Sequence, residues 1–336
     1  METGQPVPGS LFVYAPNKAA PIFFAIAYAT SAVGHIWQCY RYKSTKLIGL
    51  HPLCAVMFAI GYSLREYGAF NYMYSIPNLI VYILSQVFIY ICPPLLELAN
   101  YKILGRLFHY IPYYAPVSPG KVMRIFGFLM LLVETLNSLG VSLSSNPSSS
   151  QTQQHLGNHL TLAALSIQLI VIIIFLLLAA IFHTHCTKSK PHFKAISTTI
   201  CTLYTSMALI FIRCIYRLVE HLGDTTVDIH NSTSLGNLSP ILRYEWFFYV
   251  FEATLMLMNS VVWNIWHPGR YLPRNYHVYL ARDGVTEVEM GEEVDRRSGL
   301  EKVGAVLTLG VLFGKKEGSQ VLEEEMGDYR ACGRRS

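Results

Sequence analysis

Seven stretches of the chain are long and apolar enough to cross a membrane, with short polar segments between them. A helix needs about 20 mainly apolar residues to cross the hydrocarbon core of a bilayer. The windows lie roughly at 20–40, 47–67, 76–99, 121–143, 158–183, 195–218 and 244–266. Pro93 and Pro94 predict a kink or an end near the far side of the third window. The pattern predicts an all-α polytopic membrane protein with seven transmembrane helices.

Basic residues gather on alternate connections between these windows, and cytoplasmic loops of membrane proteins carry an excess of Lys and Arg. One set of connections holds thirteen of them: Arg41, Lys43, Lys46, Lys102, Arg106, Lys121, Arg124, Lys188, Lys190, Lys194, Arg270, Arg274 and Arg282. The other set holds only Lys18 and Arg243. The bias predicts an N-terminus outside and a C-terminus in the cytoplasm.

Two glycosylation sequons support the same orientation. Asn231 and Asn237 each begin an Asn-x-Ser/Thr motif in the loop between the sixth and seventh windows, while the proline after Asn146 excludes a third site. Because such sites are used only on the lumenal or extracellular face, we expect that loop to be outside and glycosylated.

The chain divides into three parts by composition. Residues 1–19 form an outer tail without an evident cleavable signal peptide, 20–272 the seven-helix domain, and 273–336 a charged cytoplasmic tail that we expect to be mostly disordered. The apolar patch at 303–313 is too short to span a bilayer.

The overall composition agrees with a membrane protein. Of 336 residues, 52% are hydrophobic and 14% charged, against roughly a quarter charged in soluble domains. The net charge of +5 comes from Lys and Arg between apolar windows, so we predict no nucleic-acid partner. The seven cysteines lack a pair in any outer loop, and we predict no disulfide framework.

Charged residues concentrate at the outer ends of the sixth and seventh windows. Arg213, Arg217 and Glu220 follow i, i+4, i+7 spacing, which stacks them on one helix face. Glu245 and Glu252 are seven residues apart at the start of the next helix. Ionisable residues at membrane depth usually pair with one another and mark a ligand or ion pathway. We therefore expect an Arg/Glu network between these two helices.

Two further groups of polar residues belong to the candidate site. Glu134 and Asn137 lie in the middle of the fourth window, where a lone carboxylate is costly unless it is paired. Arg65 and Glu66 lie at the outer end of the second window, where a rim charge pair in headgroup water is an equally good interpretation.

Two simpler interpretations apply to neighbouring residues. Phe12 and Tyr14 in the N-terminal tail suit interfacial anchors. Glu97, near the cytoplasmic end of the third window, is expected to be a local partner of Lys102 or Arg106.

Several motifs in this order resemble the fungal RTA-like family of lipid-translocating exporters. They are LFVYAPNKAA at the start, GYSLREYG after the second window, FIRCIYRLVEHLG after the sixth, and EWFFYVFEATLM with NIWHPGRYL at the seventh. Together they cover most of residues 11–272. The resemblance implies a seven-span protein that moves sphingoid long-chain bases or related amphiphiles outward, with one branch acting in porphyrin or haem traffic. Carried over by position, it points to Arg65, Glu66, Arg213, Arg217, Glu220, Glu245 and Glu252. Glu134 and Glu252 stand where the family is expected to have aspartate.

The charged residues in the outer half of the predicted helix bundle favour a cationic substrate. Three arginines face five glutamates there, so two carboxylates are left over to neutralise an amine or to carry protons. We therefore predict a translocase for amphiphilic lipids that confers resistance, with membrane lipids and an amphiphilic small molecule as its partners. The plasma membrane is the expected location, and the endoplasmic reticulum or vacuolar membrane are alternatives.

Other classes explain parts of the pattern. A seven-helix receptor shares the topology, but the seventh window has no lysine for a retinal Schiff base, and no Asp-Arg-Tyr or Asn-Pro-x-x-Tyr motif is present. A zinc hydrolase would need core histidines, and His35, His51, His109, His183 and His185 lie mainly on the cytoplasmic side. We predict no enzymatic activity, no metal and no cofactor. An ion-paired network that only fixes helix packing also accounts for the charges.

Overall fold

The computed structural model describes residues 7–12, 14–144, 151–189, 194–222, 240–275, 278–280 and 286–289. The predicted glycosylation sites Asn231 and Asn237 lie outside this part, as do residues 290–336 of the predicted tail. The long helices are α1 (Ala19–Tyr42), α3 (Leu50–Phe70), α4 (Ile76–Tyr90), α5 (Cys92–Tyr110), α6 (Pro119–Ser144), α7 (Gln151–Ser189), α8 (Lys194–Leu222) and α12 (Leu255–Ile265). Short helices are α2 (Thr45–Ile48), α10 (Pro240–Arg243) and α11 (Glu245–Phe248).

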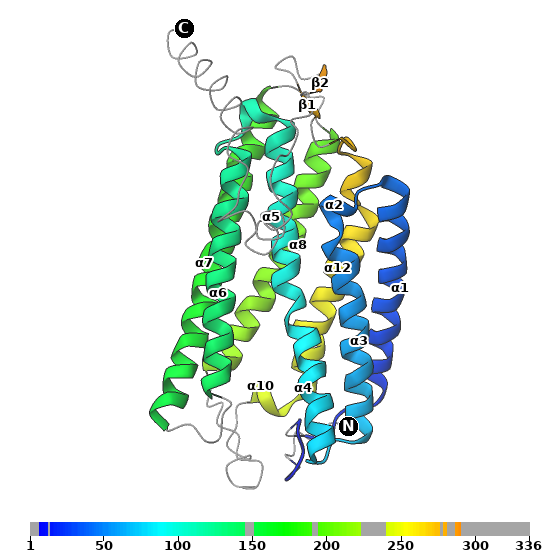
Figure 1. Cartoon of the computed structure of the whole chain (residues 1–336), viewed down its shortest axis with the longest axis vertical. Helices are drawn as coiled ribbons and strands as arrows, with labels where there is room; N and C mark the ends of the chain where they lie inside the picture. The colour runs from blue at the N-terminus through cyan, green and yellow to red at the C-terminus, as the bar shows by residue number, and fades with distance from the viewer. Residues whose placement is uncertain are drawn as a thin grey trace, which may run out of the picture.

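The helices form an elongated bundle with three groups of neighbours (Figure 1). α3 packs against α1 and α4 on one side, and α6 packs against α7 on the other. Between them, α8 contacts α5, α7 and α12. α5 is buried along almost its whole length, so it is the central helix of the bundle.

Six helical stretches in the described part are long and apolar enough to cross a membrane: Ala19–Tyr42, Ile76–Tyr110, Pro119–Leu143, Thr152–Thr187, Ile196–Leu222 and Glu245–Arg270. These stretches match six of the seven windows predicted from the sequence. The other window is occupied by α3, a helix of 21 residues whose mean hydropathy is lowered by polar residues that include His51, Arg65 and Glu66. That α3 also crosses the membrane, which would make seven crossings in total, therefore stays a prediction.

The boundaries of several helices follow from local sequence. Ser75 accepts a hydrogen bond from the Asn78 backbone amide at the start of α4, and Pro77 occupies its first turn. α4 ends at Tyr90 and α5 begins at Cys92, so the expected break at Pro93 and Pro94 is confirmed.

The third window is longer than predicted. Its helix does not end near residue 99 but continues as α5 to Tyr110. Ile103, Leu104 and Phe108 are fully buried in this extension, so packing against the bundle sustains a helix where basic residues had suggested a loop.

The two ends of the bundle differ in structure. At one end, the N-terminal segment pairs with the α3–α4 connection through the bridge between Ser10 and Met73. At the opposite end, β1 (Val278–Leu280) and β2 (Glu287–Glu289) form an antiparallel pair within the predicted tail (Figure 1).

The outer faces of the helices are apolar while polar side chains face inward. Phe23, Val33 and Leu177 are each more than half exposed, at 61%, 68% and 59%. Asn100 and Ser206 are fully buried and hydrogen-bond to each other at 2.8 Å. This distribution is the one expected of a bundle whose surroundings are lipid, in which polar groups must find partners inside the protein.

Candidate functional site

Arg65 and Glu245 form a buried ion pair at the N-terminal end of the bundle. Arg65 Nη2 lies 3.0 Å from Glu245 Oε1, and both side chains are at most 3% exposed. The pair joins α3 to α11. The rim interpretation of Arg65 is therefore wrong, because the guanidinium is enclosed by protein and does not lie in headgroup water.

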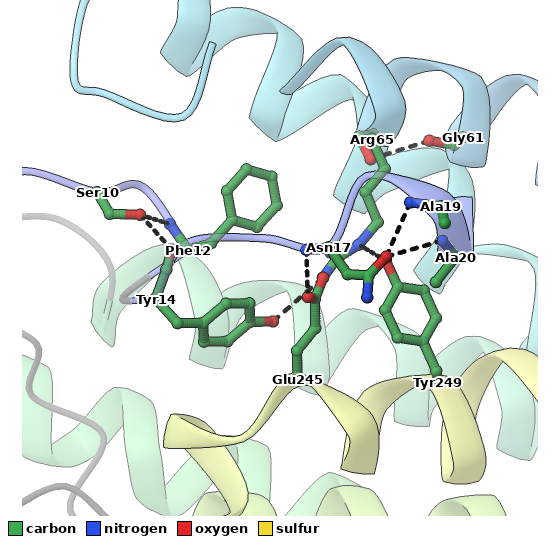
Figure 2. Close-up of polar contacts among 11 residues, drawn as sticks. Ser10, Phe12, Tyr14, Asn17, Ala19, Ala20, Gly61, Arg65, Glu245 and Tyr249 are labelled. Atoms are coloured by element: carbon green, nitrogen blue, oxygen red, sulfur yellow. Dashed lines mark hydrogen bonds and ion pairs between the residues drawn. The ribbon is translucent and has the colours of Figure 1, made fainter. Parts of the chain in front are cut away.

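The N-terminal segment closes over this pair (Figure 2). The Asn17 backbone amide donates to Glu245 Oε2 at 2.7 Å, while the Asn17 side chain accepts from the first amides of α1. Arg65 Nη2 also donates to the Tyr14 hydroxyl at 3.1 Å. Phe12 and Tyr14, which were predicted to anchor at the membrane interface, instead lie against Arg65: the Phe12 ring faces its guanidinium and the Tyr14 hydroxyl accepts its hydrogen bond.

Aromatic rings complete the enclosure of Arg65. Its guanidinium carbon lies 4.1 Å from the Phe248 ring centre, 4.9 Å from that of Phe12 and 5.5 Å from that of Tyr249. Arg65 Nε donates to the Tyr249 hydroxyl at 3.3 Å. Cation–π contacts of this kind are strongest in desolvated sites, so they help to hold a charge in the bundle.

Arg213 and Glu252 form the second buried pair. Arg213 Nε lies 2.8 Å from Glu252 Oε2 and 3.0 Å from Oε1. Glu252 is completely buried and Arg213 is 4% exposed. This contact joins α8 to the stretch Glu245–Arg270, which occupies the seventh predicted window and is called the seventh helix below. It confirms the expected link between the two charged motifs.

Glu252 lies in a π-helical turn, Tyr249–Thr254, between α11 and α12. Such turns are rare and often mark functional positions. Two backbone carbonyls of the turn accept hydrogen bonds from side chains. The Tyr249 carbonyl accepts from the Thr254 hydroxyl at 2.8 Å, and the Ala253 carbonyl accepts from the Tyr28 hydroxyl at 2.9 Å. Because the wider turn changes the helical register, Glu245 and Glu252 face different partners, although their spacing of seven suggested a shared face.

Tyr62 lies among the aromatic rings around the two pairs. It is three residues before Arg65 on α3 and is fully buried, and its ring centre lies 6.3 Å from that of Phe248. Its hydroxyl has no hydrogen-bond partner in the described part of the chain. Its ring packs parallel to that of Tyr28, with centres 5.5 Å apart. The pairs therefore belong to one continuous interior region lined by tyrosines, which the charge pattern of the sequence did not indicate.

Arg217 and Glu220 differ from the expected arrangement: they pair with each other on α8, and within the described residues neither has an ion pair or hydrogen bond to the stretch Glu245–Arg270. Arg217 also hydrogen-bonds to His221 at 3.2 Å and covers the Tyr90 ring, 4.3 Å from its centre. Residues three apart are neighbours on the surface of a helix, so Glu220 is close enough to pair with Arg217 on the same helix.

Glu66, Glu134 and Asn137 are the candidate residues that have neither an ion pair nor a hydrogen bond to the described part of the chain. All three are half-buried. Glu134 interacts electrostatically with Arg213, which is already paired with Glu252, and Glu66 interacts with Lys18. The two surplus carboxylates expected from the charge count are thus Glu66 and Glu134.

Glu97 is a buried acid whose role was predicted incorrectly. It accepts hydrogen bonds from Tyr101 and from Gln168, the latter at 2.7 Å, and not from Lys102 or Arg106. Arg106 instead donates to the Asn275 carbonyl at 2.7 Å. The lengthening of α5 explains the error, because it places Glu97 inside the bundle, where it also interacts electrostatically with Glu134.

A comparison with protein families identifies the chain. The model of RTA1-like proteins matches residues 52–275, which include every candidate residue from Arg65 to Glu252. The chain belongs to the RTA1-like family. The matched range begins inside α3, so the N-terminal segment and α1 lie before it.

Three relatives illustrate the range of RTA1-like proteins. The lipid-translocating exporter-like protein RTA1 of Leptosphaeria maculans is 53% identical over 92% of this chain and 60% of its own length. The probable lipid transporter atnI of Emericella nidulans is 23% identical over 79% of this chain and 69% of its own. The protoporphyrin uptake protein 1 of Saccharomyces cerevisiae is 26% identical over 62% of this chain and 65% of its own. The RTA1-like chain thus spans less than two thirds of the Leptosphaeria relative. No solved structure matches it significantly.

Proposed function

We propose that the chain is a membrane transporter that translocates a cationic amphiphile, with a sphingoid long-chain base as the model substrate, and so confers resistance to such compounds. Two relatives named for lipid translocation or lipid transport support the general role. The choice of a cation comes from the charges of the site.

The proposal rests on the difference between the glutamates of the site that form an ion pair with an arginine and those that do not. Arg65, Arg213 and Arg217 are each matched by one glutamate, so these six residues contribute no net charge. Of the five glutamates in this charge count, Glu66 and Glu134 remain without an ion pair or a hydrogen bond among the described residues, whereas the buried Glu97 outside the count is held by Tyr101 and Gln168. A membrane-embedded acid that has no fixed partner is suited to an exchangeable one, such as a substrate amine or a proton.

The paired residues have a different role in this proposal. They fix the packing of α3, α8 and the seventh helix, which was the alternative explanation for the whole cluster. Glu134 is the better candidate for substrate contact, because it lies on α6, near Arg213 but outside the Arg213–Glu252 pair.

We also propose that the chain crosses the membrane seven times, with its N-terminus outside. α3 has 21 residues and so extends about 31 Å at 1.5 Å per residue, close to the thickness of the hydrocarbon core. It packs between α1 and α4, both of which lie in stretches suited to a membrane. The plasma membrane is the proposed location, with the endoplasmic reticulum and vacuolar membranes as alternatives.

Reconstituted vesicles provide the test. A fluorescent long-chain base is loaded into vesicles with and without purified protein, and its appearance in the outer leaflet is followed over time. A matched probe with the same chain but a carboxylate headgroup is the control. Faster movement of the amine probe alone supports the proposal, whereas equal movement of both probes, or none above protein-free vesicles, contradicts it.

Protoporphyrin is the second substrate to include, since one relative is named for its uptake. Porphyrin propionates are anionic, so an interior with unpaired carboxylates is expected to move protoporphyrin more slowly than the amine. Preferential transport of protoporphyrin would replace the proposed substrate with this one.

A further inference from the structure

A basic cavity lies at the end of the bundle opposite the charge network. It has a volume of about 850 Å³ and is bounded by residues 37–47 on one side and by residues 269–275, after the seventh helix, on the other. Figure 1 shows the C-terminal end of α1 beside the turn that follows α12. Among the residues that the structure describes, its lining includes no acidic side chain and five basic ones: Arg41, Lys43, Lys46, Arg106 and Arg274.

The walls of the cavity are held in place by the fold. Arg106 is only 3% exposed and donates to the backbone oxygens of Pro273, Asn275 and Val278, so it fixes one wall. Gly269 allows the two walls to approach closely, because a Cβ there would lie 2.9 Å from Tyr42 Cβ. The cavity is therefore a built feature of the chain rather than a gap between mobile loops.

The other four basic side chains are available to a ligand. Arg41, Lys43, Lys46 and Arg274 are exposed, and none has a carboxylate within 4.0 Å in the described part of the chain. A positive-inside bias explains basic residues at this end in general. It does not explain why two segments more than 200 residues apart bring four of them to one cavity.

The surroundings of the cavity indicate that the ligand is a lipid. Trp37 and Tyr40 also line it and are 58% and 87% exposed. Exposed aromatic rings favour the depth of lipid headgroups. Further along α1, Ile26, Val33 and Ile36 form an exposed apolar surface. A molecule with an anionic headgroup in the cavity has room for its acyl chains along this surface.

We propose that this cavity binds the headgroup of a polyphosphorylated anionic phospholipid, such as a phosphoinositide, with its acyl chains along the outer face of α1. Basic pockets between transmembrane helices are suited to such headgroups. The predicted orientation places the cavity at the cytoplasmic leaflet, where phosphoinositides occur. The proposal concerns binding and is independent of the proposed transport function.

The test measures binding of purified full-length protein to nanodiscs of phosphatidylcholine with and without a few per cent of phosphatidylinositol 4,5-bisphosphate, using a fluorescent analogue of that lipid. The variant Lys46→Gln/Arg274→Gln removes one charge from each wall. The control Lys121→Gln/Arg124→Gln removes two charges from exposed residues outside the cavity lining, at the start of α6. Soluble inositol trisphosphate is added as a competitor to distinguish a lipid from a free phosphate compound.

We expect the wall variant to weaken binding by roughly tenfold or more, since each basic residue near an anionic lipid contributes about a fivefold effect. The control variant should change binding by less than about threefold, and inositol trisphosphate should compete poorly. Equal losses in both variants would show a general surface-charge effect and overturn the proposal. Strong competition by inositol trisphosphate would assign the cavity to a soluble polyphosphate, and equal binding with and without the phosphoinositide would exclude the site.

Discussion

The Arg213–Glu252 pair offers the sharpest test of how this bundle is held together. The variant Glu252→Gln leaves the Arg213 guanidinium, 4% exposed, without its carboxylate partner. Removing one member of a buried pair costs about 3–5 kcal/mol, because the remaining charge stays desolvated. For a protein of 336 residues, about 3 kcal/mol corresponds to a drop of roughly 4 °C in the unfolding midpoint.

The charge-free double variant separates pairing from packing. Arg213→Gln/Glu252→Gln has no buried charge left at this position, and its two amides can hydrogen-bond to each other. We expect it to recover at least about half of the stability lost by Glu252→Gln, because the coupling between contacting residues of this kind reaches about 2 kcal/mol. The unfolding midpoint in detergent, followed by tryptophan fluorescence, measures both effects.

Glu134 gives the experiment an internal check. It interacts electrostatically with Arg213 without forming an ion pair, so Glu134→Gln alone should leave the midpoint close to wild type. Added to Glu252→Gln, it should lower the midpoint further, since Arg213 then loses both neighbouring acids. The exposed Arg124→Gln serves as a control, with a change below about 0.5 kcal/mol. A Glu252→Gln protein that unfolds at the wild-type midpoint would show that this ion pair does not stabilise the bundle.

Three more predictions concern the tail, the helix packing and the topology. Tyr14→Phe removes the hydroxyl that accepts from Arg65, and we expect a loss of about 1 kcal/mol in the same unfolding assay, with faster proteolysis of the N-terminal segment. Gly140→Leu should destabilise by about 1–3 kcal/mol, because even a Cβ at this position would lie 2.4 Å from Thr161 Oγ1 on α7; an unchanged midpoint would contradict that packing. The two predicted sequons should carry glycans that an endoglycosidase removes with a mobility shift, and unmodified sequons in a glycosylating host would contradict the predicted outer loop.

Much of the helical framework was predictable because lipid imposes a simple rule on the backbone. Crossing segments must satisfy their own hydrogen bonds and face lipid with apolar side chains, so hydropathy alone located six of the helices. The break at Pro93 and Pro94 was equally predictable, because proline cannot continue the hydrogen-bond pattern of a helix. The extension of α5 was not, because its polar and basic residues suggested a loop.

The candidate site was predicted in composition but only partly in pairing. A spacing of i, i+7 places two residues on one face of a regular helix, and that assumption failed for Glu245 and Glu252 because of the π-helical turn between them. Arg65 and Glu245 are 180 residues apart, so only tertiary structure reveals their contact. Tyr14 gave no charge signal at all, although its hydroxyl binds Arg65, and neither did Tyr62, whose ring packs beside the pairs.

The role of Glu134 is tested by the translocation rate of the amine probe in vesicles that contain Glu134→Gln or Glu134→Asp. Glu289→Gln, which removes a carboxylate from the β2 strand near the opposite end of the bundle, is the matched control. We predict a large loss of rate for Glu134→Gln, at least partial activity for Glu134→Asp and wild-type activity for the control, with all three proteins folded. Wild-type translocation by a correctly folded Glu134→Gln protein would show that this unpaired acid does not serve the substrate.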